Sequence, residues 1–227
     1  FRVDTATEDS TVTFTDGKNV THSIEYKSQI PLTPVLKAVW HAGMYVMAAW
    51  FLLTNLRFML RLRRSRTPYP VEGCRYPVYL AEGLPSPCLF GLLHPAIYLT
   101  PAAAESPETL RHVLAHETTH ARHGDPLWSL LRCVCLAVYW FDPLVWIAAI
   151  VSRRDCELAC DEGALRQLGE SERIPYGQTL LRLIPVAGRP ESPMLSATTM
   201  TAGKRELKDR AVSYTHLRAH ETSQDLV

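Results

Sequence analysis

The sequence predicts an α+β fold, mostly helical with a small sheet, attached to a transmembrane helix. Three observations lead to this prediction. An apolar run of membrane-spanning length occupies residues 35–56 and is followed at once by arginines. Short β-like runs separated by turn residues fill 67–105. Helical spacing of apolar residues then continues through much of 106–168.

Bulk properties exclude some functions. The net charge of +1 provides no general field for nucleic acid, so we expect no direct nucleic acid binding. The six cysteines contain no CxxC pair and are typical of buried thiols in a reducing compartment. The chain begins with Phe1 and has no signal peptide, so we expect a fragment of a longer protein. A homodimer stays an open possibility.

The N-terminal part predicts a membrane anchor. Residues 1–31 are polar and predict a loop or small hairpin, and residues 32–57 predict the transmembrane helix. By the positive-inside rule, the basic residues that follow place the C-terminal side in the cytoplasm and residues 1–31 outside. The alternative is a buried core helix with a basic tail. The basic residues are Arg57, Arg61, Arg63, Arg64 and Arg66.

Two strands are predicted before the central helix, at 76–80 and 96–99. A strand that leads through a short loop into the helix at 106–125 would put a sheet edge next to that helix. An extended peptide could pair with such an edge, although plain scaffold strands are equally consistent.

The helix predicted at 106–125 carries the chemistry. Ser106 is a good N-cap and Gly124 a natural stop. Within it, His116 and His120 are four residues apart and so share a face, where both imidazoles can reach one metal ion. Glu117 can hold a water without being a ligand. A chance HExxH of surface histidines is the alternative.

Residues 126–151 predict two moderate helices that meet near Asp142 and pack on the membrane or enter it shallowly. Residues 152–168 predict a separate helix starting at Ser152. There, Glu157 supplies the third ligand that a catalytic zinc requires, and Asp161 can accept the outer N–H of a ligating imidazole. The alternative for both is a solvated acidic face paired with nearby arginines.

Several segments together resemble the integral-membrane zinc metallopeptidases of the BlaR/MecR antirepressor type. The resemblance implies a zincin-like, gluzincin-type site with His116, His120 and Glu157 as Zn²⁺ ligands and Glu117 as catalytic base. It matches Asp161 to the ExxxD position, and Asp125 to an acidic position expected to be structural. The segments are SPCLFGLLHPAIYLTP at 86–101, VLAHETTHARHGD at 113–125, YWFDPLVW at 139–146, RRDCELACDEGAL at 153–165, YGQTLL at 176–181 and GKRELKDR at 203–210.

The resemblance also implies a biological setting. We expect a protein of the bacterial cytoplasmic membrane, multi-pass at full length, with its active site facing the cytoplasm. The implied substrate is the protein itself or a cytoplasmic transcriptional repressor, in signal transduction linked to antibiotic resistance. The cytoplasmic peptidase domain is expected at 58–211. Residues 212–227 depart from the family, resemble a translated sequencing adapter, and are expected to pack poorly.

Three other functions stay open. A non-catalytic zinc-binding signalling module would not need Glu117. A housekeeping membrane protease would have the same site but no sensor role. A structural zinc protein would need four closed ligands, whereas three are found. An oxyanion-stabilising residue is not identified, and His112 is either a neighbour of the site or a surface histidine.

Overall fold

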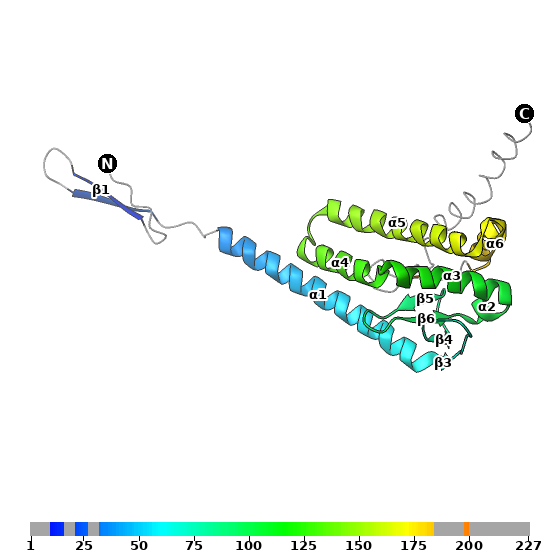
Figure 1. The fold of residues 1–227 in the computed structure, drawn as a ribbon. Coiled ribbons are helices and arrows are strands. Elements are labelled where there is room, and N and C mark those ends of the chain that lie inside the picture. The colour runs from blue at the N-terminus through cyan, green and yellow to red at the C-terminus, as the bar shows by residue number, and fades with distance from the viewer. Residues whose placement is uncertain (1–9, 16–20, 27–31, 184–197, 200–227) are drawn as a thin grey trace, which may run out of the picture. The chain divides into compact units, whose positions relative to one another are not determined.

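The computed structural model describes residues 10–15, 21–26, 32–183 and 198–199 (Figure 1). In the first two stretches, strands β1 (Ser10–Thr15) and β2 (Thr21–Tyr26) pair antiparallel as a hairpin. Of the two forms expected for residues 1–31, a loop or a small hairpin, the structure shows the hairpin, and its place outside the membrane stays a prediction. The tail at 212–227 lies outside the described residues, and its poor packing stays a prediction.

Helix α1 (Leu32–Ser65) is longer than the predicted 32–57 and continues through the arginine block. No proline or glycine follows Gly43 in this helix, so nothing in the backbone stops it where the apolar run ends. Within the described residues, α1 is the one helix long and apolar enough to cross a membrane. Two of its polar side chains bond to backbone carbonyls of the same helix. Asn55 Nδ2 donates to the Phe51 carbonyl at 2.8 Å, and Thr54 Oγ1 donates to the Trp50 carbonyl at 2.9 Å.

A small mixed sheet follows. Its described strands lie in the order β3-β4-β6-β5-β7, with β4 and β6 parallel and the other neighbours antiparallel. The two predicted strands are confirmed, whereas β3, β5 and β7 are only two or three residues long and too short to show alternation. The strands are β3 (Arg66–Pro68), β4 (Val78–Ala81), β5 (Cys88–Phe90), β6 (Ala96–Leu99) and β7 (Thr198–Thr199).

The central helix forms as its sequence predicts. After the short α2 (Pro101–Ala104), helix α3 runs over Pro107–His123. The Ser106 hydroxyl accepts a hydrogen bond from the Thr109 N–H at 3.1 Å, which satisfies one of the free donors at the helix start. Gly124 ends the helix with φ of 71°, a left-handed conformation that favours glycine.

The next segment corrects one prediction. Helix α4 (Asp125–Val138) and helix α5 (Pro143–Leu168) meet at the expected break, where the Asp142 side chain accepts from the Leu144 N–H. However, α5 is continuous through Ser152, so the separate helix at 152–168 is wrong. The change from apolar to charged residues there marks a change of environment along one helix, not a boundary. A 3-10 turn (Glu170–Glu172) and helix α6 (Arg173–Arg182) follow.

Helix α3 lies between the sheet and α5 (Figure 1). It packs very closely on α5: a Cβ added at Gly163 would lie 2.6 Å from the Thr119 methyl carbon. This approach brings the HETTH turn of α3 next to the middle of α5. The buried core that holds these elements together includes Leu89, Ile97, Leu99, Val113, Ala164, Leu165, Tyr176 and Leu180.

Candidate metal centre

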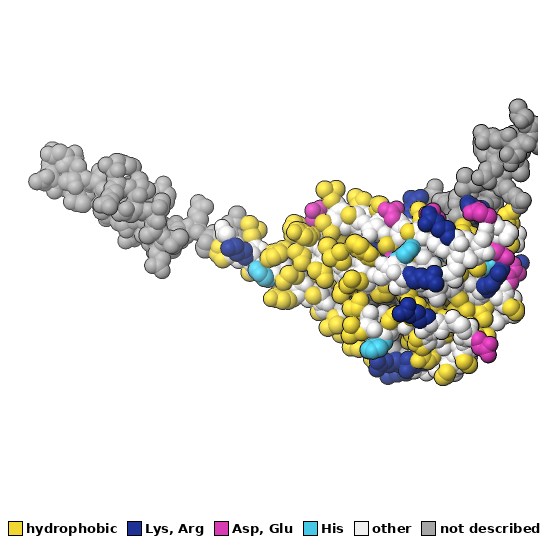
Figure 2. Space-filling view, viewed as in Figure 1, with side chains coloured by type: hydrophobic (Ala, Val, Ile, Leu, Met, Phe, Trp, Pro, Cys, Tyr) yellow, Lys and Arg dark blue, Asp and Glu magenta, His cyan; other side chains and the backbone are white. Residues whose placement is uncertain are grey.

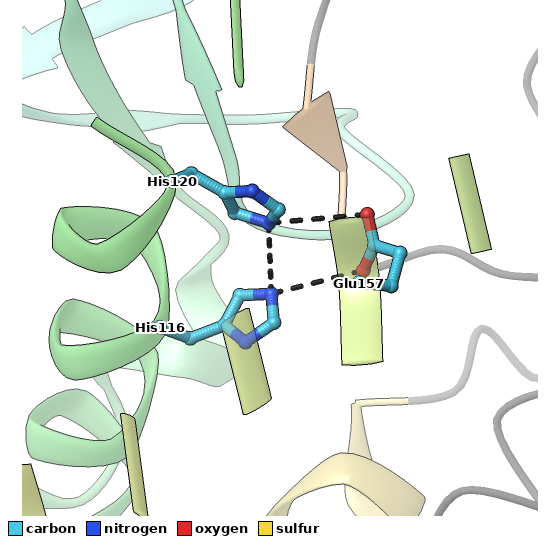
Figure 3. A group of neighbouring side chains, drawn as sticks. All are labelled: His116, His120 and Glu157. Atoms are coloured by element: carbon cyan, nitrogen blue, oxygen red, sulfur yellow. Dashed lines mark hydrogen bonds and ion pairs between the residues drawn. The ribbon is translucent and has the colours of Figure 1, made fainter. Parts of the chain in front are cut away.

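Three potential metal ligands converge between α3 and α5. His116 and His120 come from two successive turns of α3, and Glu157 comes from α5 (Figure 3). One ligand atom from each lies within 4.8 Å of the others, and all three residues are buried. The spacing of four in α3 places both imidazoles on the face towards α5. Helix α5 is continuous through Ser152, and it carries Glu157 on the side that faces the two imidazoles.

The separations suit a single small cation. The two Nε2 atoms lie 3.0 Å apart, and each is 3.8 Å from a different oxygen of Glu157. Ligands at about 2.0–2.1 Å from a tetrahedral zinc are about 3.3 Å from each other, a value between these two distances. Two histidines and one glutamate are also a known donor set for catalytic zinc. The three residues therefore fit a metal ion.

The outer nitrogen of His116 faces a buried pair. The Tyr176 hydroxyl from α6 donates to Asp161 Oδ1 at 2.7 Å, and its oxygen lies 2.8 Å from His116 Nδ1. Asp161 Oδ1 is itself 3.1 Å from His116 Nδ1. With the tautomer assigned from these contacts, His116 Nδ1–H points at this pair and leaves Nε2 for the metal.

His120 is held in a corresponding way by the start of α4. Its Nδ1 lies 2.5 Å from Asp125 Oδ2. The Cys160 thiol also donates to this oxygen at 3.1 Å. Burial raises the pKa of Asp125, but the contact with His120 outweighs this and the net pKa is lowered. Burial followed by the Asp125 charge raises the pKa of Cys160, so Cys160 is a neutral donor.

The carboxyl group of Glu117 is fully buried next to the candidate ligands. Among the described residues, neither of its carboxylate oxygens has a hydrogen-bond partner. Burial raises its pKa to about 7, against the lowering effects of His120 and His116. A buried carboxyl with this pKa can exchange a proton near neutral pH, which a general base requires. The backbone N–H of Leu89 in β5 faces this carboxyl and lowers its pKa by a smaller amount, although the contact falls short of hydrogen-bond geometry.

The carboxylates around His116 favour its protonated form. Burial lowers the pKa of His116, but Asp161 and Glu157 outweigh it and raise the pKa to about 9. At 3.0 Å, one of the two Nε2 atoms must accept a hydrogen bond from the other. A metal ion bound between the two Nε2 atoms would compete with a proton for the same lone pairs.

The structure brings together the site residues predicted from the sequence. Glu157 and Asp161 are 3% and 0% exposed, so the alternative of a solvated acidic face does not hold. The surface alternative for His112 is also wrong. His112 is fully buried, its Nδ1 lies 2.8 Å from Thr179 Oγ1, and its ring contacts the Tyr176 ring edge-on.

Sequence reasoning missed two residues that touch this site, Tyr176 and Cys160. Tyr176 lies 60 positions after His116, and only the packing of α6 on α3 brings its hydroxyl to the imidazole. Cys160 had a weak local signal, since it lies one turn after Glu157 and just before Asp161. All six cysteines are free thiols, as expected, but only Cys88 and Cys160 are buried, so the expectation of buried thiols is wrong for the other four.

Comparisons with known proteins agree with this geometry. The family model described as BlaR1 peptidase M56 matches residues 3–213. The regulatory protein BlaR1 of Bacillus licheniformis is 28% identical over 206 residues, which cover 84% of this chain. The methicillin resistance mecR1 proteins of Staphylococcus aureus and Staphylococcus epidermidis are each 28% identical over 104 residues, or 45% of this chain.

These relatives are much longer than the chain. The match spans 34% of the BlaR1 protein and 18% of each mecR1 protein. The family model, by contrast, covers nearly all of the present sequence, including both helices that carry the candidate ligands. The chain belongs to the BlaR1 peptidase M56 family.

Proposed function

We propose that this protein is a membrane-bound zinc metalloendopeptidase that cleaves a protein substrate in signal transduction. The observation that carries the proposal is the buried group of His116, His120 and Glu157 next to the buried, unpartnered carboxyl of Glu117. A purely structural metal site has no use for such a carboxyl, because burying it without a partner costs free energy.

The chain's own residues have distinct roles in this proposal. His116, His120 and Glu157 hold the ion. Bound there, Zn²⁺ would supply Lewis acidity towards the scissile carbonyl and lower the pKa of water in the site. Glu117 takes the proton as water attacks the carbonyl carbon, and then gives it to the leaving amine.

The residues behind the ligands complete the proposal. Asp161 with Tyr176 orients His116, and Asp125 orients His120. Each holds the outer nitrogen and so keeps Nε2 directed at the ion.

A peptide substrate is supported by the sheet. Strand β5 pairs antiparallel with β7, with Leu89 opposite Thr198 and Cys88 opposite Thr199. The backbone edge near Glu117 can therefore accept an extended strand, and the one it accepts here belongs to the chain itself. Extended peptides bind sheet edges by the same main-chain hydrogen bonds. We propose an extended protein segment as substrate, either from this chain or from a cytoplasmic transcriptional repressor.

Helix α1 and the relatives support a membrane setting for this proposal. The arginines at the end of α1 favour the cytoplasmic side of a bacterial membrane for the site. The names of the similar proteins, a regulatory protein and a methicillin resistance protein, support a signalling role linked to antibiotic resistance. A housekeeping protease with the same chemistry is the alternative within this enzyme class.

The decisive experiment compares Glu117→Gln with the wild type in zinc content and in cleavage of casein and a candidate repressor. We expect equal zinc content, and a loss of cleavage of about 10²–10⁴-fold or more, because the general base is removed. Glu162→Gln is the matched control, since it makes the same change at an exposed position of α5 and should leave both unchanged.

Two outcomes would contradict the proposal. Equal cleavage by wild type and Glu117→Gln would refute the role of Glu117. Zinc binding without cleavage of either substrate by the wild type would favour a non-catalytic signalling module.

A further inference from the structure

The hairpin of α4 and α5, residues 127–151, exposes an unusual amount of apolar surface. Six of its large apolar side chains are each at least 54% exposed: Leu127, Trp128, Phe141, Leu144, Ile147 and Ile150. Figure 2 shows hydrophobic side chains gathered over this end of the folded body, whereas charged side chains gather at the other end. Soluble monomers rarely expose a continuous apolar surface of this extent.

The hairpin packs on the apolar part of α1. Phe51 of α1 is buried with Leu136 and Ala137 of α4, and Met47 joins them from one turn earlier. From α5, Trp146 and Ala149 pack against the same cluster. The hairpin therefore lies alongside the segment of α1 that has the length and composition of a membrane span.

The basic residues of both helices lie at matching depth. Phe51 is six residues, or about 9 Å, before Arg57 on α1. Ala149 is four residues, or about 6 Å, before Arg153 on α5. Because Phe51 and Ala149 belong to one cluster, the two helices pass from apolar to basic at nearly the same level. Such a change is typical of a membrane–water interface.

The two charged residues within the hairpin are satisfied locally. Arg132 NH2 donates to Ser129 Oγ at 2.7 Å, and its NH1 donates to Ser152 Oγ at 3.3 Å. This guanidinium is thus held between α4 and α5, next to the level of Arg153. Asp142 caps α5 through the Leu144 N–H. These contacts lower the free-energy cost of bringing Arg132 and Asp142 close to lipid, but they do not remove it.

We infer that the α4–α5 hairpin is inserted in the lipid bilayer beside α1, entering and leaving on the side of the arginine block. Residues 143–152 of α5 measure about 15 Å, half of the roughly 30 Å hydrocarbon core. The hairpin is therefore too short to span the membrane and must return. We infer lipid as the partner of this surface, because the exposed apolar side chains of the hairpin adjoin those of the apolar part of α1.

The insertion fixes where substrate must approach. Glu157 is four residues, or about 6 Å, beyond Arg153 along α5. The candidate metal centre then lies within about 10 Å of the membrane surface. This consequence rests on the proposed function, whereas the insertion does not. It restricts the substrate to protein segments that can reach the lipid surface.

The test uses the whole chain in vesicles of phosphatidylcholine and phosphatidylglycerol. Ile147→Cys is compared with Glu162→Cys, which lies on the same helix 15 residues later and has a 65% exposed side chain. A charged maleimide should label Cys at 147 about tenfold or more slowly than at 162, because a thiol in lipid does not ionise. Peptide mass spectrometry separates these sites from the native cysteines.

A second measurement keeps the wild-type sequence. A phosphatidylcholine with a diazirine in its acyl chain should label peptides from 144–151 on illumination, and should not label the exposed loop residues Leu92 and Leu93. Fast maleimide labelling at 147 would overturn the inference, because the hairpin would be in water. Slow maleimide labelling without diazirine labelling would also overturn it, because protein, such as a second copy, would then cover the hairpin.

Discussion

Tyr176 offers the sharpest test of how the candidate ligands are held. Its hydroxyl is fully buried, donates to Asp161 at 2.7 Å and lies 2.8 Å from His116 Nδ1. The variant Tyr176→Phe removes both contacts and keeps the ring, its packing and its edge-on contact with His112. We expect weaker zinc binding, because His116 would lose one of the groups that fix its orientation.

The size of the effect follows from the contacts that remain. Removing a group behind a metal ligand typically lowers metal affinity by about 10–100-fold. Asp161 stays 3.1 Å from His116 Nδ1, so the imidazole keeps a charged partner. We therefore expect the lower limit, about tenfold or about 1.4 kcal/mol. Replacing Asp161 by Asn should reach the upper limit, because the charge is lost as well.

The assay is competition for zinc with a chromophoric chelator, using protein in lipid nanodiscs at neutral pH. Tyr98→Phe is the matched control, since Tyr98 is a buried tyrosine of the sheet, stacked on Tyr79. Wild-type affinity for Tyr176→Phe would refute the role of this hydroxyl. An equal loss in Tyr98→Phe would show that affinity reports general stability instead.

Four further predictions concern helix packing, helix capping, the pH dependence of zinc affinity and the pH dependence of stability. Gly163→Ala should lower the free energy of unfolding by about 1–2 kcal/mol, because the new methyl meets Thr119 Cγ2 at 2.6 Å, and Thr119→Ser should restore it in thermal unfolding. Ser106→Ala should cost about 1 kcal/mol in denaturant unfolding and leave zinc affinity unchanged, since it removes a helix cap and a hydrogen bond to Thr109 Oγ1, neither of which involves the candidate metal ligands. The pKa of His116 is raised from 6.5 to about 9 in the protein alone, so apparent zinc affinity should rise with pH and level off near pH 9. The raised pKa of His116 also contributes to the free energy of unfolding of the zinc-free protein. This contribution should be fully present below pH 6.5 and should be lost as the pH rises through about 9, which unfolding measured at several pH values would show. A flat zinc-affinity profile between pH 6.5 and 9 would contradict the predicted pH dependence of zinc binding.

Local sequence patterns predicted several helix ends correctly. Ser106 and Gly124 delimit α3 because a cap and a left-handed stop act on their immediate neighbours. The break at Asp142 was also readable, since proline at 143 removes a backbone donor. The boundary expected at Ser152 was wrong because the sequence there changes polarity without a residue that stops a helix. Polarity reports the surroundings of a helix, not its length.

The sequence by itself determined the two imidazoles and Glu117, because three residues within five positions of one helix have a fixed mutual geometry. It also suggested Glu157, but only as an acidic residue with another explanation available. The approach of α5 to α3 places Glu157 at 3.8 Å from each imidazole, and the docking of α6 adds Tyr176. These contacts join residues 37 to 60 positions apart, and their distances depend on how whole helices pack, which spacing along the chain does not specify.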